Sequence, residues 1–369
     1  MGLYKEIPGN RIWFITDTHL GVKNNSNEWI ESTRDYFFNW FFPLVKENYK
    51  DGDILFHLGD FFDSRQSLNL KVLNLGIEIA EEMSNIFKDG VYIIVGNHDI
   101  WGKTTNEVNS LKSIKWIPGV NVYEDPITLV TPSRRILMMP WRKDEQEDIA
   151  FLESADPHDI LCCHIGISGF RVNKYVVSEH GAEVSNFGKF KKVYSGHIHY
   201  SQKSNNVNML GSPYEITRSD MDNPKSITLL DLSDLSENVF LNDFSPKFKR
   251  VYFSDLLEKT LDELDPIFKN NYVDILIDPI MSLKANLSLF TDLLTSQRTL
   301  SFHPYDPNQA TSLSQQIMDV EGKQFNVMDF IKEYIFNMVD DQDTKDRMLK
   351  SLSKLYTIVS KQEQEQRTL

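Results

Sequence analysis

Apolar residues in the first two-thirds of the chain form short, continuous runs separated by longer segments of helical periodicity. Three compact runs, at 11–16, 53–58 and 91–95, alternate with helix-like segments at 28–48 and 69–88. Continuous apolar strands between helices are typical of a sheet covered on both faces. Further strand-like runs follow at closer spacing: 121–124, 127–131, 135–140, 159–165, 191–197, 206–210 and 226–232. The pattern predicts an α/β sandwich of two sheets flanked by helices.

A smaller unit with its own strand and helix pattern begins near Phe248. Its residues alternate as strand, helix, strand, helix and strand up to about residue 304, which predicts a small α/β capping domain. A polar stretch separates it from two amphipathic helices, whose apolar residues recur at helical spacing. We therefore predict a main domain at 1–245, a capping domain at 246–305, a linker at 306–325 and a C-terminal helical pair at 326–369.

Composition limits the classes of protein that this chain can be. The 369 residues are 41% apolar, ample for a core, and a net charge of −14 argues against a protein that coats nucleic acid by charge alone. Cys162 and Cys163 are adjacent in an apolar run, so we expect reduced core cysteines of a cytoplasmic protein. The first residues lack the apolar stretch of a signal peptide, and the longest aromatic run, at 36–45, is too short to span a bilayer. We expect no association with a membrane.

Residues that bind metals follow several of the predicted strands. In "SGHIH", His197 and His199 are two apart, so in an extended segment both point to the same side. Alone, such a pair is more often a polar stripe on an exposed strand. Ligands of open α/β sheets collect outside the carboxyl ends of strands, however, and donors follow five predicted strands here. They are Asp17 with His19, Asp60, Asn97 with His98 and Asp99, His164, and His197 with His199.

Seven of these side chains suit a pair of metal ions. Carboxylate, carboxamide and imidazole donors without thiolate match Mn²⁺, Fe²⁺ or Zn²⁺, and seven donors are too many for one ion. Asp60 has two carboxylate oxygens and can bridge two ions, which together can clamp a phosphoryl oxygen. We expect one ion to be held by Asp17, His19 and His199, and the other by Asn97, His164 and His197.

Each part of this pattern is weak by itself. D-x-H and G-D are common by chance, an isolated His164 would more often be a core histidine, and only "GNHD" after an apolar strand is fairly specific. The ordered set of five segments is what indicates a metal centre. Gly59, Gly96 and Gly196 each precede a proposed donor, where a sharp turn or a close backbone approach requires a residue without a side chain.

The ordered set D-x-H, G-D, G-N-H-[DE], H and G-H-x-H is complete here and resembles the calcineurin-like metallophosphoesterase superfamily. Within it, "GDFFDSR" and "VGNHD" resemble SbcD-type DNA double-strand-break repair nucleases. The segments "THLGVKNNSNEWI", "MMPW", "YSGHIH" and "GSPYEITRSD" are most similar to short phage-encoded recombination nuclease subunits that work with an SbcC-type ATPase. The resemblance covers essentially the whole chain, strongly to about residue 235 and more loosely beyond.

The resemblance implies Mn²⁺-dependent phosphodiester hydrolysis, with 3′-to-5′ exonuclease activity on duplex DNA and endonuclease activity on single strands. It implies that the seven donors bind two Mn²⁺ ions, with Mg²⁺, Fe²⁺ or Zn²⁺ as alternatives. His98 would bind no metal but would face the scissile phosphate and protonate the leaving oxygen, and Asp99 would orient the imidazole of His98. Some cellular relatives carry a histidine at the position of Asp63, so no catalytic role is assigned to this carboxylate. The implied partners are DNA and an SbcC-type, SMC-like ATPase in the host cytoplasm.

Basic residues form a local exception in this acidic chain. We expect contacts with DNA phosphates from them, although a solvated face would carry the same charges. His180 lies in a polar loop and is a weaker candidate for substrate contact. The basic residues are Arg171, Lys174, Lys189, Lys191 and Lys192.

The helix predicted at 70–87 carries two apolar stripes, whereas one stripe is enough to cover one sheet. Contact between the first two helices accounts for part of this excess, and the remainder predicts a homodimer, which the resemblance also implies. The two C-terminal helices are expected to bind the coiled-coil root of the ATPase; the alternative is packing on the capping domain. One stripe is Leu70, Leu73, Ile77, Ala80 and Phe87, and the other is Val72, Leu75, Ile79, Met83 and Ile86.

Two other functions are compatible with part of the pattern. Another metallophosphoesterase, either a phosphatase or a small-molecule phosphodiesterase, would use the same donors. Phosphoprotein phosphatases are expected to show "GDxxDRG" and "GNHE", however, where this chain has "GDFFDSR" and "GNHD". A non-catalytic scaffold for the ATPase is the second alternative, and the intact donor set together with His98 argues against it.

Overall fold

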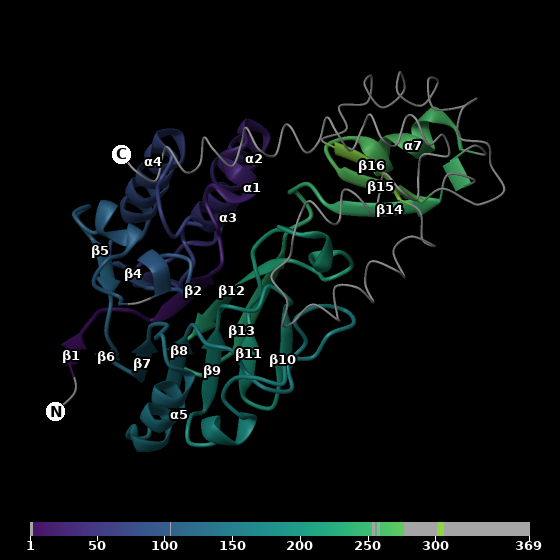
Figure 1. Ribbon diagram of the computed structural model, residues 1–369. Helices are drawn as coiled ribbons and strands as arrows, with labels where there is room; N and C mark the ends of the chain where they lie inside the picture. Colours follow the sequence, from purple (N-terminus) through teal and green to yellow (C-terminus); the bar gives the residue numbers. More distant parts are fainter. Residues whose placement is uncertain (1–2, 104, 253–254, 257–258, 277–300, 306–369) are drawn as a thin grey trace, which may run out of the picture. The chain divides into compact units, whose positions relative to one another are not determined.

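The computed structural model describes residues 3–103, 105–252, 255–256, 259–276 and 301–305. Residues Met1–Pro304 form one compact unit. The described strands build two large sheets and one small sheet (Figure 1). The predicted linker at 306–325 and the helical pair at 326–369 lie outside the described residues.

The first sheet has six strands in the order β13-β12-β2-β3-β4-β5. Strands β2 to β5 are parallel, and β12 and β13 extend the sheet in antiparallel pairing. Two strands from late in the chain, β12 and β13, therefore extend the sheet that β2 to β5 form. The strands are β2 (Arg11–Ile15), β3 (Asp53–His57), β4 (Val91–Ile94), β5 (Val120–Tyr123), β12 (Ser226–Asp231) and β13 (Glu237–Leu241).

The second sheet has seven strands in the order β1-β6-β7-β8-β9-β11-β10. Its central strands β7, β8, β9 and β11 are parallel, so their carboxyl ends share one edge. The strands are β1 (Leu3–Glu6), β6 (Ile127–Val130), β7 (Arg135–Met139), β8 (Ile160–Cys163), β9 (Lys192–Ser195), β10 (Gln202–Ser204) and β11 (Val207–Met209).

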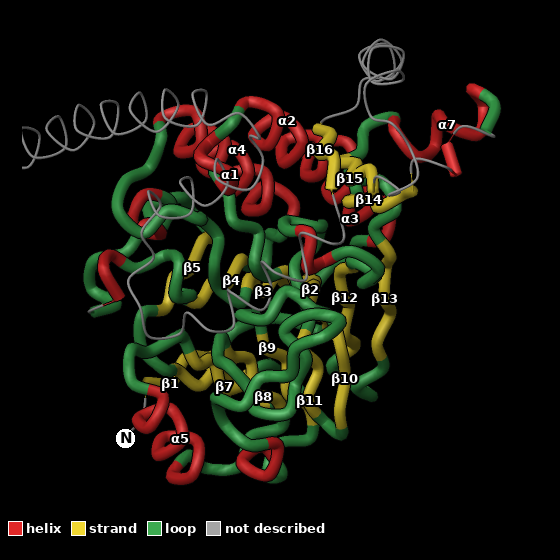
Figure 2. Tube along the Cα trace, turned by 45° about the vertical axis from the view of Figure 1, so that its right-hand side comes forward, coloured by secondary structure: helices red, strands yellow, loops and turns green. Residues whose placement is uncertain are grey.

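Helices cover the outer face of each sheet, as Figure 2 shows with α1, α2 and α4 beyond one sheet and α5 beyond the other. Asn69 caps α4 by accepting a hydrogen bond from the backbone N–H of Lys71 at 2.8 Å. The α-helices are α1 (Val22–Asn25), α2 (Asn27–Asp35), α3 (Phe42–Asn48), α4 (Leu70–Ile86) and α5 (Glu145–Ser154). A π-helix, η1 (Tyr36–Phe41), and short 3₁₀ turns complete them: η2 (Trp101–Lys103), η3 (Ser110–Ser113), η4 (Val184–Phe187) and η5 (Arg218–Asp220).

Pro43 neither ends nor breaks the first long helical segment. The π-helix Tyr36–Phe41 precedes it, with the Phe42 N–H donating to the carbonyl of Phe37, and Pro43 lies in the first turn of α3. A proline is tolerated there because that turn leaves its N–H groups without intrahelical partners. The segment therefore continues to Asn48, as its apolar pattern predicts.

The two sheets face each other across an apolar layer. Phe14 of the first sheet stacks on Tyr194 of the second with ring centroids 4.3 Å apart, and Phe56 packs edge-on against Phe14. Both cysteines are free and buried, as expected. The predicted two-sheet α/β sandwich is thus confirmed.

A small third sheet follows the sandwich, where the sequence predicts a capping domain. Its strands are β14 (Phe248–Tyr252), β15 (Tyr272–Leu276) and β16 (Ser301–Tyr305), in that order, and helix α7 (Leu261–Phe268) connects the parallel pair β14 and β15. The indole of Trp29 in α2 stacks on the ring of Tyr272, with centroids 5.0 Å apart. The helix predicted near 283–294 lies outside the described residues.

Several elements were not predicted from the sequence, among them the short α1 and three edge strands. Strand β1 is exposed along its whole length, β10 and β13 are mostly exposed at sheet edges, and helix α5 is rich in acidic residues. These strands and α5 lack the buried apolar periodicity on which the predictions depend.

Most of the apolar side chains on α4 are buried by contacts within the chain. The stripe from Val72 to Ile86 is buried, and in the other stripe Ala80 and Phe87 are buried as well. Leu73 and Ile77 are half-buried, and only Leu70 is strongly exposed, at 75%. The surface left for a second copy is therefore smaller than the sequence predicts.

Candidate metal centre

All seven predicted metal donors meet at one edge of the sandwich. Those that follow β2, β3 and β4 come from the first sheet, and those that follow β8 and β9 come from the second. The site therefore joins the carboxyl ends of parallel strands from both sheets, as expected for ligand sites in such folds. Asp17, Asp60 and His164 are almost completely buried at its base.

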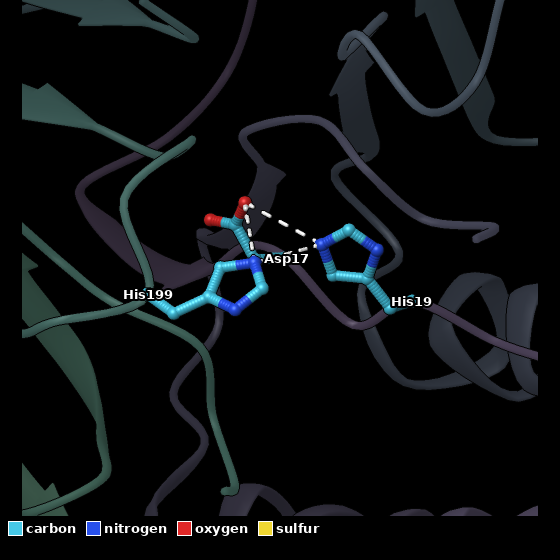
Figure 3. Close-up of side chains that lie close together, drawn as sticks. All are labelled: Asp17, His19 and His199. Carbon is cyan, nitrogen blue, oxygen red and sulfur yellow. Dashed lines mark hydrogen bonds and ion pairs between the residues drawn. The ribbon is translucent and has the colours of Figure 1, made fainter. Parts of the chain in front are cut away.

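The first donor set is Asp17, His19 and His199, whose side chains converge on one point (Figure 3). The Nε2 atoms of His19 and His199 are 3.0 Å apart. Their distances to Oδ1 of Asp17 are 3.9 and 4.0 Å, respectively. Two imidazole nitrogens and a carboxylate oxygen aimed at a common point could hold a cation between them.

The second donor set is Asn97, His164 and His197. The amide oxygen of Asn97 lies 3.0 Å from Nε2 of His164 and 2.7 Å from Nδ1 of His197. Asp60 stands between the two sets, because its Oδ2 is 3.5 Å from Nε2 of His19 and 3.3 Å from Nε2 of His164. This is the arrangement that a carboxylate shared by two ions requires.

The donors are held by unusual backbone conformations. Asp17, His19, Asp60 and His197 all have positive φ, at 51°, 43°, 54° and 84°. Such conformations cost about 1–3 kcal/mol each for residues other than glycine and collect at functional sites. The rest of the fold must therefore stabilise this edge, and the backbone N–H of His197 does so by donating to the carboxylate of Asp17 at 3.0 Å.

The glycines before the donors are sterically required. A Cβ at Gly96 would overlap the backbone nitrogen and the carboxylate of Asp60, and one at Gly196 would overlap Thr16. Gly59 has a φ of 90° and approaches His164 closely. The close packing predicted from the sequence is thus confirmed.

Burial and mutual charges set the protonation of the donors. Burial opposes ionisation of Asp60, but His164, followed by His19 and His98, together outweigh it and hold the pKa of that carboxyl well below its usual range. Burial likewise disfavours a charged His164, yet the Asp60 and Asp17 carboxylates raise the pKa of His164 to about 9. Burial and the neighbouring His19 lower the pKa of His199 to about 3. Without metal, the buried carboxylates thus keep His164 protonated while His199 is neutral, and a divalent cation bound here would take the place of the His164 proton.

His98 lies beside the donor sets, and its partner is Asp63. Nδ1 of His98 donates to the backbone carbonyl of Asp63 at 3.0 Å and lies 3.4 Å from its Oδ1. The same Oδ1 is 3.0 Å from Nδ1 of His19. Burial opposes ionisation of Asp63, but hydrogen bonds from His19 and His98 lower its pKa. A carboxylate that holds a metal-binding imidazole and a second imidazole together was not recognised in the sequence, although "GDFFD" contains it.

The sequence led us to expect that Asp99 orients His98, but in the structure the residue that contacts Nδ1 of His98 is Asp63. The carboxylate of Asp99 accepts hydrogen bonds from the backbone N–H groups of Asp60 at 2.9 Å, Gly96 at 3.0 Å and Phe62 at 3.1 Å. Burial, and then the charge of Asp60, raise the pKa of Asp99 to about 6. Asp99 therefore fixes the backbone that carries Asp60, and Asp63 occupies the position that was expected for Asp99.

A buried ion pair supports the loop that carries His199. Nζ of Lys225 donates to the backbone carbonyl of His199 and to Oδ1 of Asp220, both at 2.7 Å. Lys225 is 5% exposed and Asp220 is 2% exposed. No motif in the sequence indicates this pair, because the two residues acquire their role only through tertiary contacts.

The five basic residues expected at DNA divide into two groups. Arg171 and Lys174 lie on an exposed hairpin beside His197 and His199. Lys189, Lys191 and Lys192 lie at the amino end of β9, the opposite end of that strand from the histidines, where they contact Ala155, Asp159 and Glu237, respectively. His180 is exposed in the loop before η4.

Comparison with known proteins agrees with this site. Residues 10–201, just over half of the chain, match the calcineurin-like phosphoesterase family. The chain therefore belongs to the calcineurin-like phosphoesterases, and the candidate centre lies within a fold that implies divalent metal ions and phosphodiester hydrolysis.

One relative is exonuclease subunit 1 of Enterobacteria phage T4, which is 27% identical over 249 residues that span 66% of this chain and 70% of the relative. This similarity supports the resemblance to SbcD-type nucleases. Among solved structures, an archaeal phosphodiesterase aligns with 63% of this chain and 99% of its own, at 12% identity and a TM-score of 0.34. A protein of unknown function from Aquifex aeolicus aligns with 50% of this chain and 94% of its own, at 20% identity and a TM-score of 0.25. None of the described helices is long and apolar enough to cross a membrane.

Proposed function

We propose that this chain is a Mn²⁺-dependent DNA nuclease that degrades duplex DNA from 3′ ends and cuts single strands. The observation that carries the proposal is the position of Asp60 between two complete donor sets, 3.5 Å from His19 and 3.3 Å from His164. The relative named exonuclease subunit 1 supports DNA as the substrate. The site of action would be the host cytoplasm.

Each residue has a distinct task in this proposal. Asp17, His19 and His199 would hold one ion, Asn97, His164 and His197 would hold the other, and Asp60 could serve both. Divalent ions bound there would stabilise the charge that develops on the phosphodiester.

The proton comes from the chain itself. Nδ1 of His98 is occupied by Asp63, so its Nε2 is the nitrogen left to face substrate. In the imidazolium form Nε2 also carries a proton, which could pass to the leaving oxygen and leave His98 neutral with its Nδ1 proton still donated to Asp63, the general-acid role. A nitrogen of His98 lies within 4.8 Å of donor atoms of His19 and Asp60, so His98 adjoins the proposed metal donors.

End-labelled duplex DNA with Mn²⁺ distinguishes the proposed nuclease from the other candidate functions. The nuclease should release labelled nucleotides, and Asp60→Asn should abolish release while Asp234→Asn, at an exposed carboxylate, should not. Hydrolysis of bis(p-nitrophenyl) phosphate without DNA cleavage would favour a small-molecule phosphodiesterase. Inactivity on both substrates with Mn²⁺ bound would favour a scaffold.

We also propose an ATPase partner of the SbcC type. The description of the phage relative as a subunit supports a partner of some kind. The helical pair predicted at 326–369, outside the described residues, is the proposed contact. Truncation near Asp319 should abolish co-purification with the ATPase and keep Mn²⁺-dependent cleavage of short DNA. Full binding by the truncated chain would contradict this assignment.

A homodimer remains part of the proposal. Leu70, with Leu73 and Ile77, is the apolar surface that α4 leaves for a second copy. Leu70→Glu combined with Ile77→Glu should give a folded monomer by light scattering, whereas Leu3→Glu, at an exposed position of β1, should leave the dimer intact. A wild-type chain that is monomeric at micromolar concentration would rule the dimer out.

A further inference from the structure

A second binding region adjoins the metal centre. A cavity of about 290 Å³ is lined by His197 and His199 on one side and by Val172 and Ser178 on another. A larger cleft of about 850 Å³ lies next to it, and Ser219 belongs to the walls of both. The two hollows therefore lie on either side of a shared wall residue, and the smaller one contains two of the metal donors.

The larger cleft is basic, although the chain as a whole is acidic. Six basic and three acidic side chains line it, and once Asp220 and Asp274 are counted, which pair with Lys225 and with two arginines, the cations keep an excess of one within a protein of net charge −14. Arg218 and Arg250 share the carboxylate of Asp274, at 2.9 and 3.4 Å, so their guanidinium groups are held in place. This charge favours an anionic occupant. The basic residues are Lys174, Arg218, Lys225, Lys247, Lys249 and Arg250.

Two exposed tyrosines stand on the walls of the cleft. Tyr175 is 84% exposed and Tyr252 is 48% exposed, and both line the cleft. Rings so exposed within a cleft are free to stack against the flat face of a ligand. Aromatic rings among basic groups are the combination that binds single-stranded nucleic acid, because bases stack on the rings while cations follow the phosphates.

The hairpin that carries Tyr175 is well ordered for such a role. Its strands pair from Gly169 to Ser178, and the buried ring of Phe170 anchors its base. At the tip, Oδ1 of Asn173 accepts hydrogen bonds from the backbone N–H groups of Tyr175 at 2.8 Å and Val176 at 3.0 Å. The tip is therefore folded before any ligand arrives, which lowers the entropy cost of binding.

We infer that the cleft binds a single strand of nucleic acid, with an unpaired base stacked on Tyr175, and guides that strand to the metal centre. The inference rests on the proposed nuclease function and specifies its substrate as a strand freed from its complement near the cut. A duplex hides the faces of its bases, so it cannot use Tyr175 in this way. An acidic peptide would use the cations but would gain little from the tyrosines.

Binding without metal tests the cleft separately from catalysis. Fluorescence anisotropy in EDTA would compare a thymidine strand of about 16 nucleotides with an abasic strand of equal length. The wild type should bind the thymidine strand about tenfold more tightly, the equivalent of one stacked base. Tyr175→Ala should lose this preference, Tyr175→Phe should keep it, and Tyr4→Ala, at an exposed tyrosine of β1, should match the wild type.

These measurements distinguish the proposed stacking on Tyr175 from the proposed nuclease function. Equal binding of both strands by the wild type, or an undiminished preference in Tyr175→Ala, would overturn the role of Tyr175. Binding of polyglutamate as tight as that of the thymidine strand would instead indicate a site for acidic protein segments and would also overturn the inference. Failure of the wild type to cleave DNA with Mn²⁺ would count against the nuclease, whereas the metal-free binding data report on the cleft alone. Circular dichroism of Tyr175→Ala should match the wild type, because the side chain is exposed.

Discussion

Asp63 offers the sharpest test of how the site is organised. Its Oδ1 is 3.0 Å from Nδ1 of the proposed metal donor His19 and 3.4 Å from Nδ1 of His98. Asp63→Asn preserves shape but removes the negative charge that holds both imidazoles. Asp63→Asn should therefore weaken both metal binding through His19 and proton transfer by His98.

The size of the effect follows from these contacts. A hydrogen bond to a charged group contributes about 1.5–3 kcal/mol, and the side chain of Asp63 is 30% exposed, which favours the lower half of that range. Loss of such a carboxylate behind a metal-binding histidine lowers affinity or activity about 10- to 100-fold. We expect Asp63→Asn to weaken Mn²⁺ binding and to slow hydrolysis of bis(p-nitrophenyl) phosphate within this range.

The assay combines a Mn²⁺ titration by calorimetry with rates at saturating metal. Asp63→Asn should remain folded, with a thermal midpoint close to that of the wild type. Asp99→Asn is the comparison variant, because its amide would face the N–H groups of Asp60, Gly96 and Phe62 and should destabilise the fold. Unchanged Mn²⁺ affinity and rate in Asp63→Asn would refute the role given to this carboxylate.

Three further outcomes are expected from thermal unfolding and activity. Burial raises the pKa of Glu215 to about 7, so the native state keeps a proton that the unfolded chain loses near pH 4.5. As the pH rises from about 4.5 to 7, the free energy of unfolding should therefore fall by up to about 3 kcal/mol. Glu215→Gln should remove this pH dependence from thermal unfolding measured across that range. Gly96→Ala should abolish activity because its Cβ would overlap Asp60, while Gly188→Ala, where a Cβ meets only the Ser185 carbonyl oxygen at 3.6 Å, should remain active. Lys225→Met should lower the free energy of unfolding by about 3–5 kcal/mol, because it leaves Asp220 buried without its cation.

The sequence predicted the parts of this protein that local pattern determines. Continuous apolar runs identified the central strands, and the order of short motifs placed donors such as Asp17 and Asp60 at one sheet edge. This worked because parallel strands must end together, so residues after them must meet. Edge elements such as β13 escaped prediction because they bury little apolar surface.

The remaining features of the site depend on tertiary contacts that the sequence pattern does not reveal. Asp99 follows His98 directly, and this adjacency favoured it as the orienting carboxylate. The chain turns so that Asp63, 35 residues earlier, reaches the imidazole instead. The pairing of Lys225 with Asp220 and the exposure of Tyr175 likewise depend on packing that no periodicity encodes.

Metal content measured beside nuclease rate tests the central claim most directly. The wild type, Asp60→Ala and His98→Ala would each be loaded with Mn²⁺, assayed for bound metal by elemental analysis, and tested on end-labelled duplex DNA. Asp60→Ala should lose metal and cleavage together, whereas His98→Ala should retain two ions and cleave about 10²- to 10⁴-fold more slowly. A His98→Ala chain that lost its metal, or an Asp60→Ala chain that cleaved DNA at the wild-type rate, would contradict the account.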